Sequence, residues 1–463
     1  MLDFLDVFER IVKRDTVEIY PEFKVEPSKD LMIKGSHFYA IWDAENNLWS
    51  TDWFRAVRLI DQELKRYAEE NKERLKNCTV HVLYLRHSSN GSIDKWIKFT
   101  TKQFDDNWKA LDEKILFAND EPKRSDYASK RLPYPLEKMD TPNYNELTSV
   151  LYSPDELKKI EWAIGAIITG DSKKLQKFEV LYGSGGTGKG TILGIIKKLF
   201  DGYCCTFNAK ALGSSSESFA LEPFKNNPLV GIDFDGELSR IEDNTRINTL
   251  VSHEELIVNE KFRSTYPNRF KCFLFMGTNK PVKITDAKSG LIRRLIDVSP
   301  TGNKVPTKTY ERAIEGIEFE LPGIAWHCRE VYLENKHEYD EYIPVNMLGA
   351  TNDFYNFVEE NYDTFKAEDS TTLKAAWEMY KNYCEEARVT YPYNKKAFKE
   401  ELKNYFRSFE ERSWTDSGCS VYNLYSGFKF RLGGETIKKE LKKLSKTGEW
   451  LNLQSTESLF DIY

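Results

Sequence analysis

The sequence predicts an α/β fold built around a phosphate-binding loop, and three adjacent stretches carry that prediction. The first is an apolar, β-rich run over residues 178–182, and the second is a run over 183–189 that holds four glycines and a lysine. The third repeats apolar residues at helical spacing over residues 192–200. Strand, glycine-rich loop and helix in this order form the backbone cradle that many proteins use for phosphate groups.

The loop has the residue types that a phosphate requires. Glycines let backbone N–H groups crowd around phosphates because no Cβ blocks close approach, and a helix N-terminus adds free N–H groups and partial positive charge. In this Walker A-like pattern Lys189 would reach the β- and γ-phosphates. Gly190 stands where the pattern usually has a hydroxyl, so Thr191 becomes the expected Mg²⁺ ligand, directly or through water. The expected nucleotide contacts are Gly183, Ser184, Gly185, Gly186, Thr187, Gly188, Lys189, Gly190 and Thr191. The alternative is a glycine-rich turn with a chance lysine.

Length and composition set wide bounds. A chain of 463 residues is expected to hold about two to four domains. The net charge of −6 does not favour nucleic acid as a partner, but a basic groove can exist on an acidic protein. Seven cysteines without a C-x-x-C pair argue against zinc, and with no signal peptide they indicate a reducing cytoplasm, that of the host if a phage encodes the chain. No apolar run is long enough to span a bilayer.

Residues 1–140 predict a mixed α/β domain. Residues 38–42 and 48–50 suggest a β-hairpin, and a long amphipathic helix follows over 53–75. Asp43 and Asp52 could be carboxylates of a metal-dependent primase, but a turn and a helix cap explain them better. Residues 120–140 are charged and contain proline, which is typical of a linker.

An acidic cluster follows the next strong strand, over residues 228–235. An NTPase needs one aspartate there to hold Mg²⁺ and a nearby carboxylate to orient the attacking water. Asp233 or Asp235 would take the first role, and Asp235 or Glu237 the second. The alternative is an exposed acidic turn after a buried strand.

Two further candidates come later in the chain. A strand over residues 269–276 ends near Asn279, whose amide could hydrogen-bond a γ-phosphate or the water, unless it only forms a turn. Arg293 and Arg294 precede another apolar strand, and either could meet phosphate oxygens, including those of a neighbouring subunit.

The order of these motifs resembles the superfamily III helicases, the AAA+ motors of viral, phage and plasmid replication, and among them the phage and poxvirus primase-helicase group. The resemblance covers residues 145–345, and residues 141–345 are therefore expected to form an AAA+ P-loop motor domain. Residues 1–140 would form the collar domain that precedes it.

The resemblance implies a homo-hexameric ring with ATP and Mg²⁺ bound between neighbours. It assigns Lys189 and Thr191 to the nucleotide and Mg²⁺, and Arg293 or Arg294 to the adjacent subunit's ATP. A pore hairpin would lie between the acidic strand and the strand that ends near Asn279, and it would contact DNA. In it Lys261 would touch a phosphate, Phe262 would contact sugar or base, and Arg263 would assist. A lysine beside an aromatic ring suits single-stranded DNA.

Residues 346–463 predict a C-terminal winged-helix-like domain that binds DNA. Three helices are expected over residues 354–365, 373–387 and 395–406, followed by a hairpin over 419–432. Because the sequence ends in an apolar run, we expect a further domain after it, and a primase is the candidate partner.

These observations predict an ATP-dependent DNA helicase that translocates on single-stranded DNA and separates forked DNA in phage or mobile-element replication. Two alternatives remain open. One is a nucleotide kinase-like phosphotransferase, because such enzymes also tolerate glycine after the lysine. The other is a replication initiator or packaging ATPase that binds DNA without unwinding it.

Overall fold

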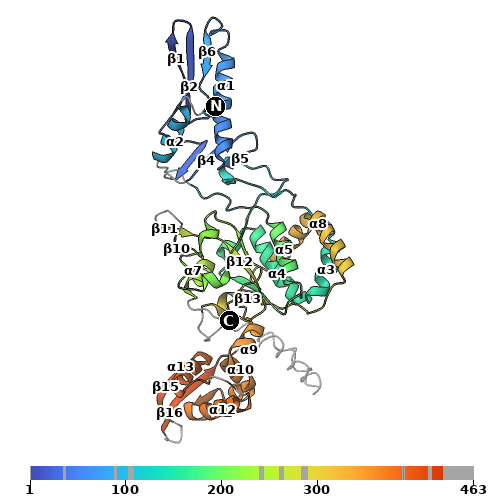
Figure 1. Cartoon of the computed structure of the whole chain (residues 1–463). Helices are drawn as coiled ribbons and strands as arrows, with labels where there is room; N and C mark the ends of the chain where they lie inside the picture. Colours follow the sequence, from blue (N-terminus) through green and yellow to red (C-terminus); the bar gives the residue numbers. More distant parts are fainter. Residues whose placement is uncertain are drawn as a thin grey trace.

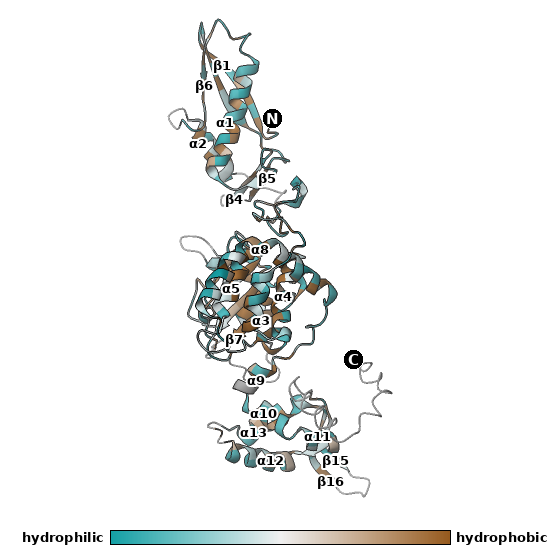
Figure 2. Ribbon diagram, turned by 90° about the vertical axis from the view of Figure 1, so that its right-hand side faces the viewer, coloured by the Kyte–Doolittle hydropathy of each residue, from teal (hydrophilic) through white to brown (hydrophobic). Residues whose placement is uncertain are grey.

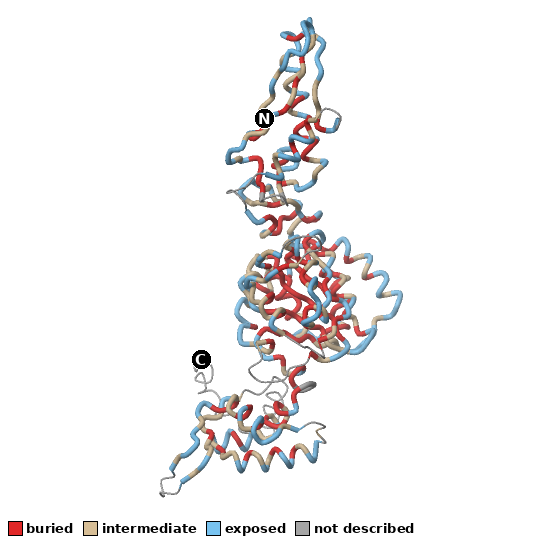
Figure 3. Tube along the Cα trace, turned by 60° about the vertical axis from the view of Figure 1, so that its left-hand side comes forward, coloured by how far each residue is buried: buried red, intermediate tan, exposed pale blue. Residues whose placement is uncertain are grey.

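The computed structural model describes residues 2–34, 38–87, 91–102, 109–238, 244–259, 265–282, 290–387, 389, 392–414 and 420–430. Three regions follow one another along the long axis of the molecule (Figure 1). Buried residues are concentrated in the central region, which carries the phosphate loop (Figure 3). Within the described ranges, none of the helices combines the length and the apolar character that a membrane crossing requires.

Within its described residues, the N-terminal region contains two small sheets and two α-helices. One sheet has the order β1-β2-β6 and the other β3-β4-β5. The predicted hairpin is confirmed as β4 and β5, and Asp52 caps α1 by accepting a hydrogen bond of 3.0 Å from the Phe54 amide. Asp43 accepts hydrogen bonds from the Glu45 amide and the Arg55 guanidinium, which confirms it as a turn residue. The elements are β1 (Leu5–Lys13), β2 (Thr16–Phe23), β3 (Leu31–Lys34), β4 (Phe38–Asp43), β5 (Leu48–Ser50), α1 (Trp53–Glu70), β6 (Thr79–Val82) and α2 (Ser92–Lys102).

The segment predicted as a linker is packed against the central region. Its short helix, η2 (Arg124–Asp126), is followed by Leu132 and Tyr134, which are buried in the central core. The Tyr134 hydroxyl donates a hydrogen bond of 2.6 Å to the Leu199 carbonyl oxygen. The segment therefore behaves as a strap, because its aromatic and aliphatic side chains supply part of the core that they cross.

A five-stranded parallel sheet organises the central region within the described residues. Its order is β13-β7-β12-β9-β8, with every pair parallel. Four of the five strands are almost fully buried, as expected for a parallel sheet that is covered on both faces, and β8 at the end of the strand order is partly exposed. The fold class is therefore mixed α/β, as predicted. The strands are β7 (Phe178–Tyr182), β8 (Cys204–Thr206), β9 (Val230–Asp233), β12 (Phe273–Thr278) and β13 (Leu295–Val298).

Helices pack around this sheet, and apolar residues are concentrated in it and in helices such as α4 (Figure 2). Ser153 caps α4 by accepting a hydrogen bond from the Glu156 amide. The chain from Thr307 to Glu334 forms one continuous helix, α8, with Pro322 inside it. The elements are α3 (Pro142–Leu151), α4 (Pro154–Ile168), η3 (Ser172–Lys174), α5 (Lys189–Leu199), α6 (Ala209–Leu212), η4 (Glu222–Phe224), α7 (Thr245–Val251), η5 (Ile292–Arg294) and α8 (Thr307–Glu334).

One predicted strand is divided in the structure. Arg269 ends β11 (Tyr266–Arg269), which pairs antiparallel with β10 (Glu255–Val258), and the sheet strand β12 begins only at Phe273. The prediction of one strand over 269–276 was wrong at its start because hairpin pairing captures Arg269.

The C-terminal region has helices and a three-stranded sheet of order β14-β16-β15. The predicted hairpin over 419–432 is instead a single strand, β16, between β14 and β15. Its aromatic core meets the central core at Phe430, which packs against both, while Met347 and Leu348 lie in the central core. The elements are α9 (Val345–Thr351), α10 (Asp353–Glu360), α11 (Tyr362–Glu368), β14 (Ser370–Thr372), α12 (Leu373–Glu386), α13 (Lys395–Leu402), η6 (Lys403–Tyr405), β15 (Phe406–Trp414) and β16 (Ser420–Phe428).

The middle of the sheet contains a buried carboxyl group. Glu179 lies on β7, is fully buried, and neither of its side-chain oxygens has a hydrogen-bond partner among the described residues. Burial raises the pKa of Glu179 to about 8, against the opposing effect of Lys159. The folded state therefore holds this carboxyl protonated at neutral pH, while the unfolded chain ionises it.

We predict that Glu179→Gln stabilises the protein at neutral pH. Below the pKa of glutamate in the unfolded chain, native Glu179 does not lower the free energy of unfolding. As the pH rises from there towards about 8, the unfolded chain ionises the group and the protein loses stability. At pH 7.5 the variant should gain about 2–4 kcal/mol in free energy of unfolding, and at pH 4.5 nearly nothing. Urea unfolding at both pH values measures the difference. Glu315→Gln, on the exposed face of α8, is the control, and an equal gain at both pH values would contradict the assignment.

Candidate functional site

The phosphate loop connects the end of β7 to the start of α5. Gly188 adopts a left-handed conformation with a φ of 93° at the N-cap of α5. A Cβ on this residue would lie 2.7 Å from the Leu151 side chain of α3. The loop can therefore turn into the helix at this point only with glycine.

Lys189 lies across the loop. Its residue is 7% exposed, and its ammonium group donates hydrogen bonds to the carbonyl oxygens of Gly183 at 2.6 Å and Ser184 at 2.8 Å. A third bond of 2.8 Å reaches Asn279 Oδ1. Burial lowers the pKa of Lys189, and the charge of Asp235 opposes that shift. The ammonium group is therefore held at the mouth of the loop by acceptors that a phosphate could replace.

The loop surface leaves room for a phosphate chain. Added Cβ atoms at Gly185, Gly186 and Gly190 would meet nothing within 4 Å. No side chain of the described residues caps α5, so the first N–H groups of that helix keep their hydrogen-bonding capacity. The Thr187 hydroxyl donates to the Ser184 carbonyl oxygen at 2.8 Å and so braces the loop from within. This open cradle of donors fits a triphosphate.

The acidic residues lie at the end of β9 in two different environments. Asp233 is 9% exposed and accepts hydrogen bonds from the Ala209 amide at 2.7 Å and the Asp235 amide at 3.2 Å. Burial raises the pKa of Asp233. Asp235 is exposed, and Glu237 forms an ion pair of 2.7 Å with Lys280.

Asn279 joins the two sides of the site. It follows β12, which lies between β7 and β9, so parallel pairing brings all three strand ends to one edge of the sheet. Its Oδ1 accepts from Lys189 at 2.8 Å, and its Nδ2 approaches Asp235 Oδ1 at 3.5 Å. Gly277 permits this arrangement, because a Cβ there would lie 2.9 Å from the Phe234 carbonyl oxygen. The structure thus brings together the predicted lysine, amide and carboxylates.

Thr191 lies on the first turn of α5 and faces α8. Its hydroxyl is 3.4 Å from the Tyr310 hydroxyl. Tyr310 and Lys280 are neighbours of the site that sequence reasoning did not select. Lys280 directly follows Asn279 and could have been found from that adjacency, whereas Tyr310 comes from a distant helix that no local pattern connects to the loop.

The two arginines lie at the opposite ends of the strands, where β7 and β13 begin. Leu295 pairs with Phe178 at the start of β7, so Arg293 and Arg294 are separated from the phosphate loop by the length of that strand, about 13 Å or more. Arg294 is 5% exposed and donates hydrogen bonds to Ser252 Oγ and the Gly290 carbonyl oxygen. Arg293 is exposed.

The residues predicted to contact DNA, Lys261, Phe262 and Arg263, lie outside the described residues. The two strands that flank them are described: β10 and β11 pair from Glu255 with Arg269 to Val258 with Tyr266. This hairpin stem stands between the acidic strand and β12 in the chain, where the sequence had predicted a polar segment.

A protein family of unknown function (DUF5906) matches residues 181–294. This segment runs from the end of β7 to Arg294 and includes the phosphate loop, the acidic residues and Asn279. No curated protein matches the chain.

Similar solved structures include three of the NrS-1 C-terminal region. One, an apo structure of residues 305–718, has a TM-score of 0.44 and 12% identity over 86% of this chain and 97% of that chain. An A-form apo structure has a TM-score of 0.40 and 14% identity over 68% and 85% of the two chains. Another A-form apo structure has a TM-score of 0.37 and 16% identity over 63% of this chain and 76% of that chain.

We predict that Gly188→Ala destabilises the central region. The substitution forces a left-handed conformation on a residue with a Cβ and drives that atom into Leu151, with an expected loss of about 2–4 kcal/mol. Gly190→Ala is the matched control, because its Cβ would enter open space and alanine favours the helix. Equilibrium urea unfolding compares them, and equal stabilities would refute the geometry of the loop.

Proposed function

We propose that this protein is an ATP-hydrolysing motor of the AAA+ superfamily III type, which translocates on single-stranded DNA and unwinds duplex DNA during replication. The observation that carries the proposal is Asn279, whose amide lies between the phosphate-loop lysine and the acidic turn after β9. An amide in that position can respond to the γ-phosphate and to the carboxylate that orients water. A phosphate loop without this bridge would suit simple nucleotide binding equally well.

In the proposed reaction, the loop amides and the N-terminus of α5 bind the phosphates of ATP. Lys189 exchanges its carbonyl contacts for β- and γ-phosphate oxygens, so its charge opposes the charge that develops during cleavage. Asp233 and Thr191 would hold Mg²⁺, which supplies charge neutralisation at the phosphates. Asp235 is the better placed carboxylate to orient water, because it is exposed beside Asn279, whereas Glu237 is paired with Lys280.

The location of Arg293 supports a role at the ATP site of the neighbouring subunit in a ring of six subunits. Arg293 is exposed and lies where β7 begins, a strand's length from its own phosphate loop, so an ATP phosphate chain that it contacts must be bound at the loop of a neighbouring copy. Arg294 is less suited to that role because Ser252 and Gly290 already accept its hydrogen bonds. We assign Arg293 to the transition-state charge in the adjacent subunit.

DNA contact is proposed for two parts of the chain. The β10–β11 stem would present Lys261, Phe262 and Arg263 to a strand in the central pore. The C-terminal region, with three-stranded sheet and helices, is proposed to be a winged-helix-like DNA-binding domain. Within it Lys399 already contacts Glu411 and the Phe409 ring, which leaves Lys395 and Lys396 as the more available cations of α13.

We predict that Lys189→Ala abolishes ATP hydrolysis and, with it, unwinding of forked DNA. The variant loses the cation that neutralises the transferring phosphate, so turnover should fall by at least about a hundredfold. Lys197→Ala, on the exposed side of the same helix, is the control and should hydrolyse ATP normally. Phosphate release measured with and without single-stranded DNA tests the pair. Full activity in Lys189→Ala would refute the site, and a phosphorylated nucleoside product would indicate a kinase instead.

We also predict that Lys261→Ala retains basal ATP hydrolysis but loses unwinding. The phosphate loop is intact in this variant, while the proposed contact with the DNA backbone is removed. A strand-displacement assay on forked DNA, run beside the ATPase assay and the same Lys197→Ala control, separates the two activities. Unchanged unwinding would place the DNA contact elsewhere.

A further inference from the structure

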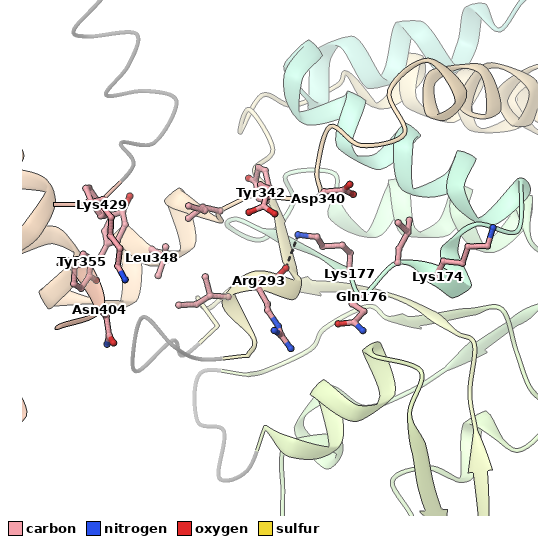
Figure 4. A pocket seen from close by; sticks show the side chains of 16 residues that line it. Lys174, Gln176, Lys177, Arg293, Asp340, Tyr342, Leu348, Tyr355, Asn404 and Lys429 are labelled. Carbon is pink, nitrogen blue, oxygen red and sulfur yellow. Dashed lines mark hydrogen bonds between the residues drawn. The ribbon is translucent and has the colours of Figure 1, made fainter. Parts of the chain in front are cut away.

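A cavity of 620 Å³ lies between the central and C-terminal regions, far from the phosphate loop. One wall is formed by the segment before β7 and by Arg293, at the sheet edge opposite the loop. The other wall is formed by Tyr355 of α10, by Asn404 and Tyr405, and by the end of the described C-terminal region at Lys429 and Phe430. Figure 4 shows Lys177 on one side of this junction cavity and Tyr355, Asn404 and Lys429 on the other.

Lys177 is a buried cation in the wall of the junction cavity. It is 8% exposed, and its ammonium group donates one hydrogen bond of 2.8 Å to the Arg293 carbonyl oxygen. No carboxylate in the described part of the chain forms an ion pair with it within 4.0 Å. An ammonium group has three donors, so two directions remain for another acceptor. Because a buried charge without a counter-ion is unfavourable, the site favours an anion.

The side chains that line the cavity carry charges of both signs. Arg293, Lys174 and Lys429 add cationic groups to Lys177, while Asp340 and Glu341 supply two carboxylates on the segment after α8. Lys174 and Asp340 are already paired with Asp171 and His337. Since Arg293 is assigned to a neighbouring subunit, the cations available to a ligand of this cavity are Lys177 and Lys429, against one remaining carboxylate, Glu341. Two ammonium groups on opposite walls suit a phosphate monoester.

The opposite wall is aromatic. Phe430 is half-buried, with its ring centroid 5.2 Å from that of Tyr355 and 5.7 Å from that of Tyr405. Two covered oxygens in this wall, Tyr355 Oη and Asn404 Oδ1, have no hydrogen-bond partner among the described residues. A planar ring with polar edges would stack against such a wall and could satisfy these groups after small side-chain rotations. The volume exceeds what inorganic phosphate needs and suits a nucleotide.

We propose that the junction cavity is a second nucleotide site, with the phosphate at Lys177 and the base against the wall formed by Tyr355, Tyr405 and Phe430. The nucleotide is either a free nucleoside monophosphate or one unit of a single DNA strand that passes between the two regions. The proposal goes beyond the motor function and does not depend on it, since none of these contacts involves the phosphate loop.

Binding is measured on the full chain carrying Lys189→Ala, which removes the phosphate-loop contact. Two probes are used: a fluorescent methylanthraniloyl derivative of AMP, and a fluorescein-labelled oligothymidine of 20 nucleotides. Lys429→Glu and Lys177→Met are each added to this background and should weaken the bound probe at least tenfold. Lys374→Glu, an exposed charge reversal on α12 away from the cavity, is the matched control and should leave the affinity unchanged.

The two probes distinguish the sources of the nucleotide. Loss of labelled AMP binding in both cavity variants supports a free nucleotide, and loss of oligothymidine binding alone supports a DNA strand. If neither probe responds to the cavity variants, the proposal is wrong. The ATPase assay on the chain with an intact Lys189 is independent of this outcome, so a failure here is separate from a failure of the proposed motor.

The pH dependence separates a phosphate contact from a purely structural effect of Lys177. Burial lowers the pKa of Lys177 to about 8, with Asp340 and Glu341 acting in the opposite direction. Since the charged ammonium binds the phosphate, affinity should fall by up to about tenfold as the pH rises from 7 to 9. In Lys177→Met this fall should disappear, and a fall of the same size there would overturn the role of Lys177. The other charged groups lining the cavity are Lys174, Arg293 and Lys429.

Discussion

The hydrogen bond between Lys189 and Asn279 is the contact on which the candidate site depends. It exists because β12 pairs with β7 on one side and with β9 on the other, so that three parallel strands end at one edge. With β12 elsewhere in the sheet, the lysine and the carboxylates would have no common neighbour. The order of the strands, more than the glycine-rich loop alone, therefore turns separate motifs into one site.

The same parallel sheet sends a second group of residues to its other edge. Arg293 precedes β13, and Lys177 precedes β7, so both lie where the sheet meets the C-terminal region. The Lys177 ammonium group donates a hydrogen bond to the Arg293 carbonyl oxygen. This bond holds the backbone of Arg293, whose exposed side chain we propose for contact with the nucleotide of a neighbouring subunit. An anion at Lys177 would therefore act directly on the residue that we propose to contact the nucleotide of the adjacent subunit.

Local patterns predicted the parts of the fold that depend on local physics. The strand over 178–182 and the cap at Asp52 were both recognisable, because apolar spacing and capping oxygens act within a few residues. Tertiary contacts decided the rest. Arg269 joined a hairpin, the strap over Leu132 became core, and Tyr310 reached Thr191 from another helix. The burial of Arg294 against Ser252 has no sequence signal either.

Strand β7 connects the two edges of the molecule's central sheet. Lys177 comes directly before it and Gly183 directly after it, about 20 Å apart at strand spacing. Between them Glu179 lies where β7 pairs with Phe275 of β12 and Ile296 of β13, and its buried carboxyl group has no hydrogen-bond partner among the described residues. The backbone ladders to both neighbours and the buried apolar side chains of β7 hold it in register, so a ligand at either end acts on one rigid element whose two ends carry different binding groups. Communication between the phosphate loop and the junction cavity would therefore require a change in the pairing of β7, which is a discrete event and not a gradual deformation.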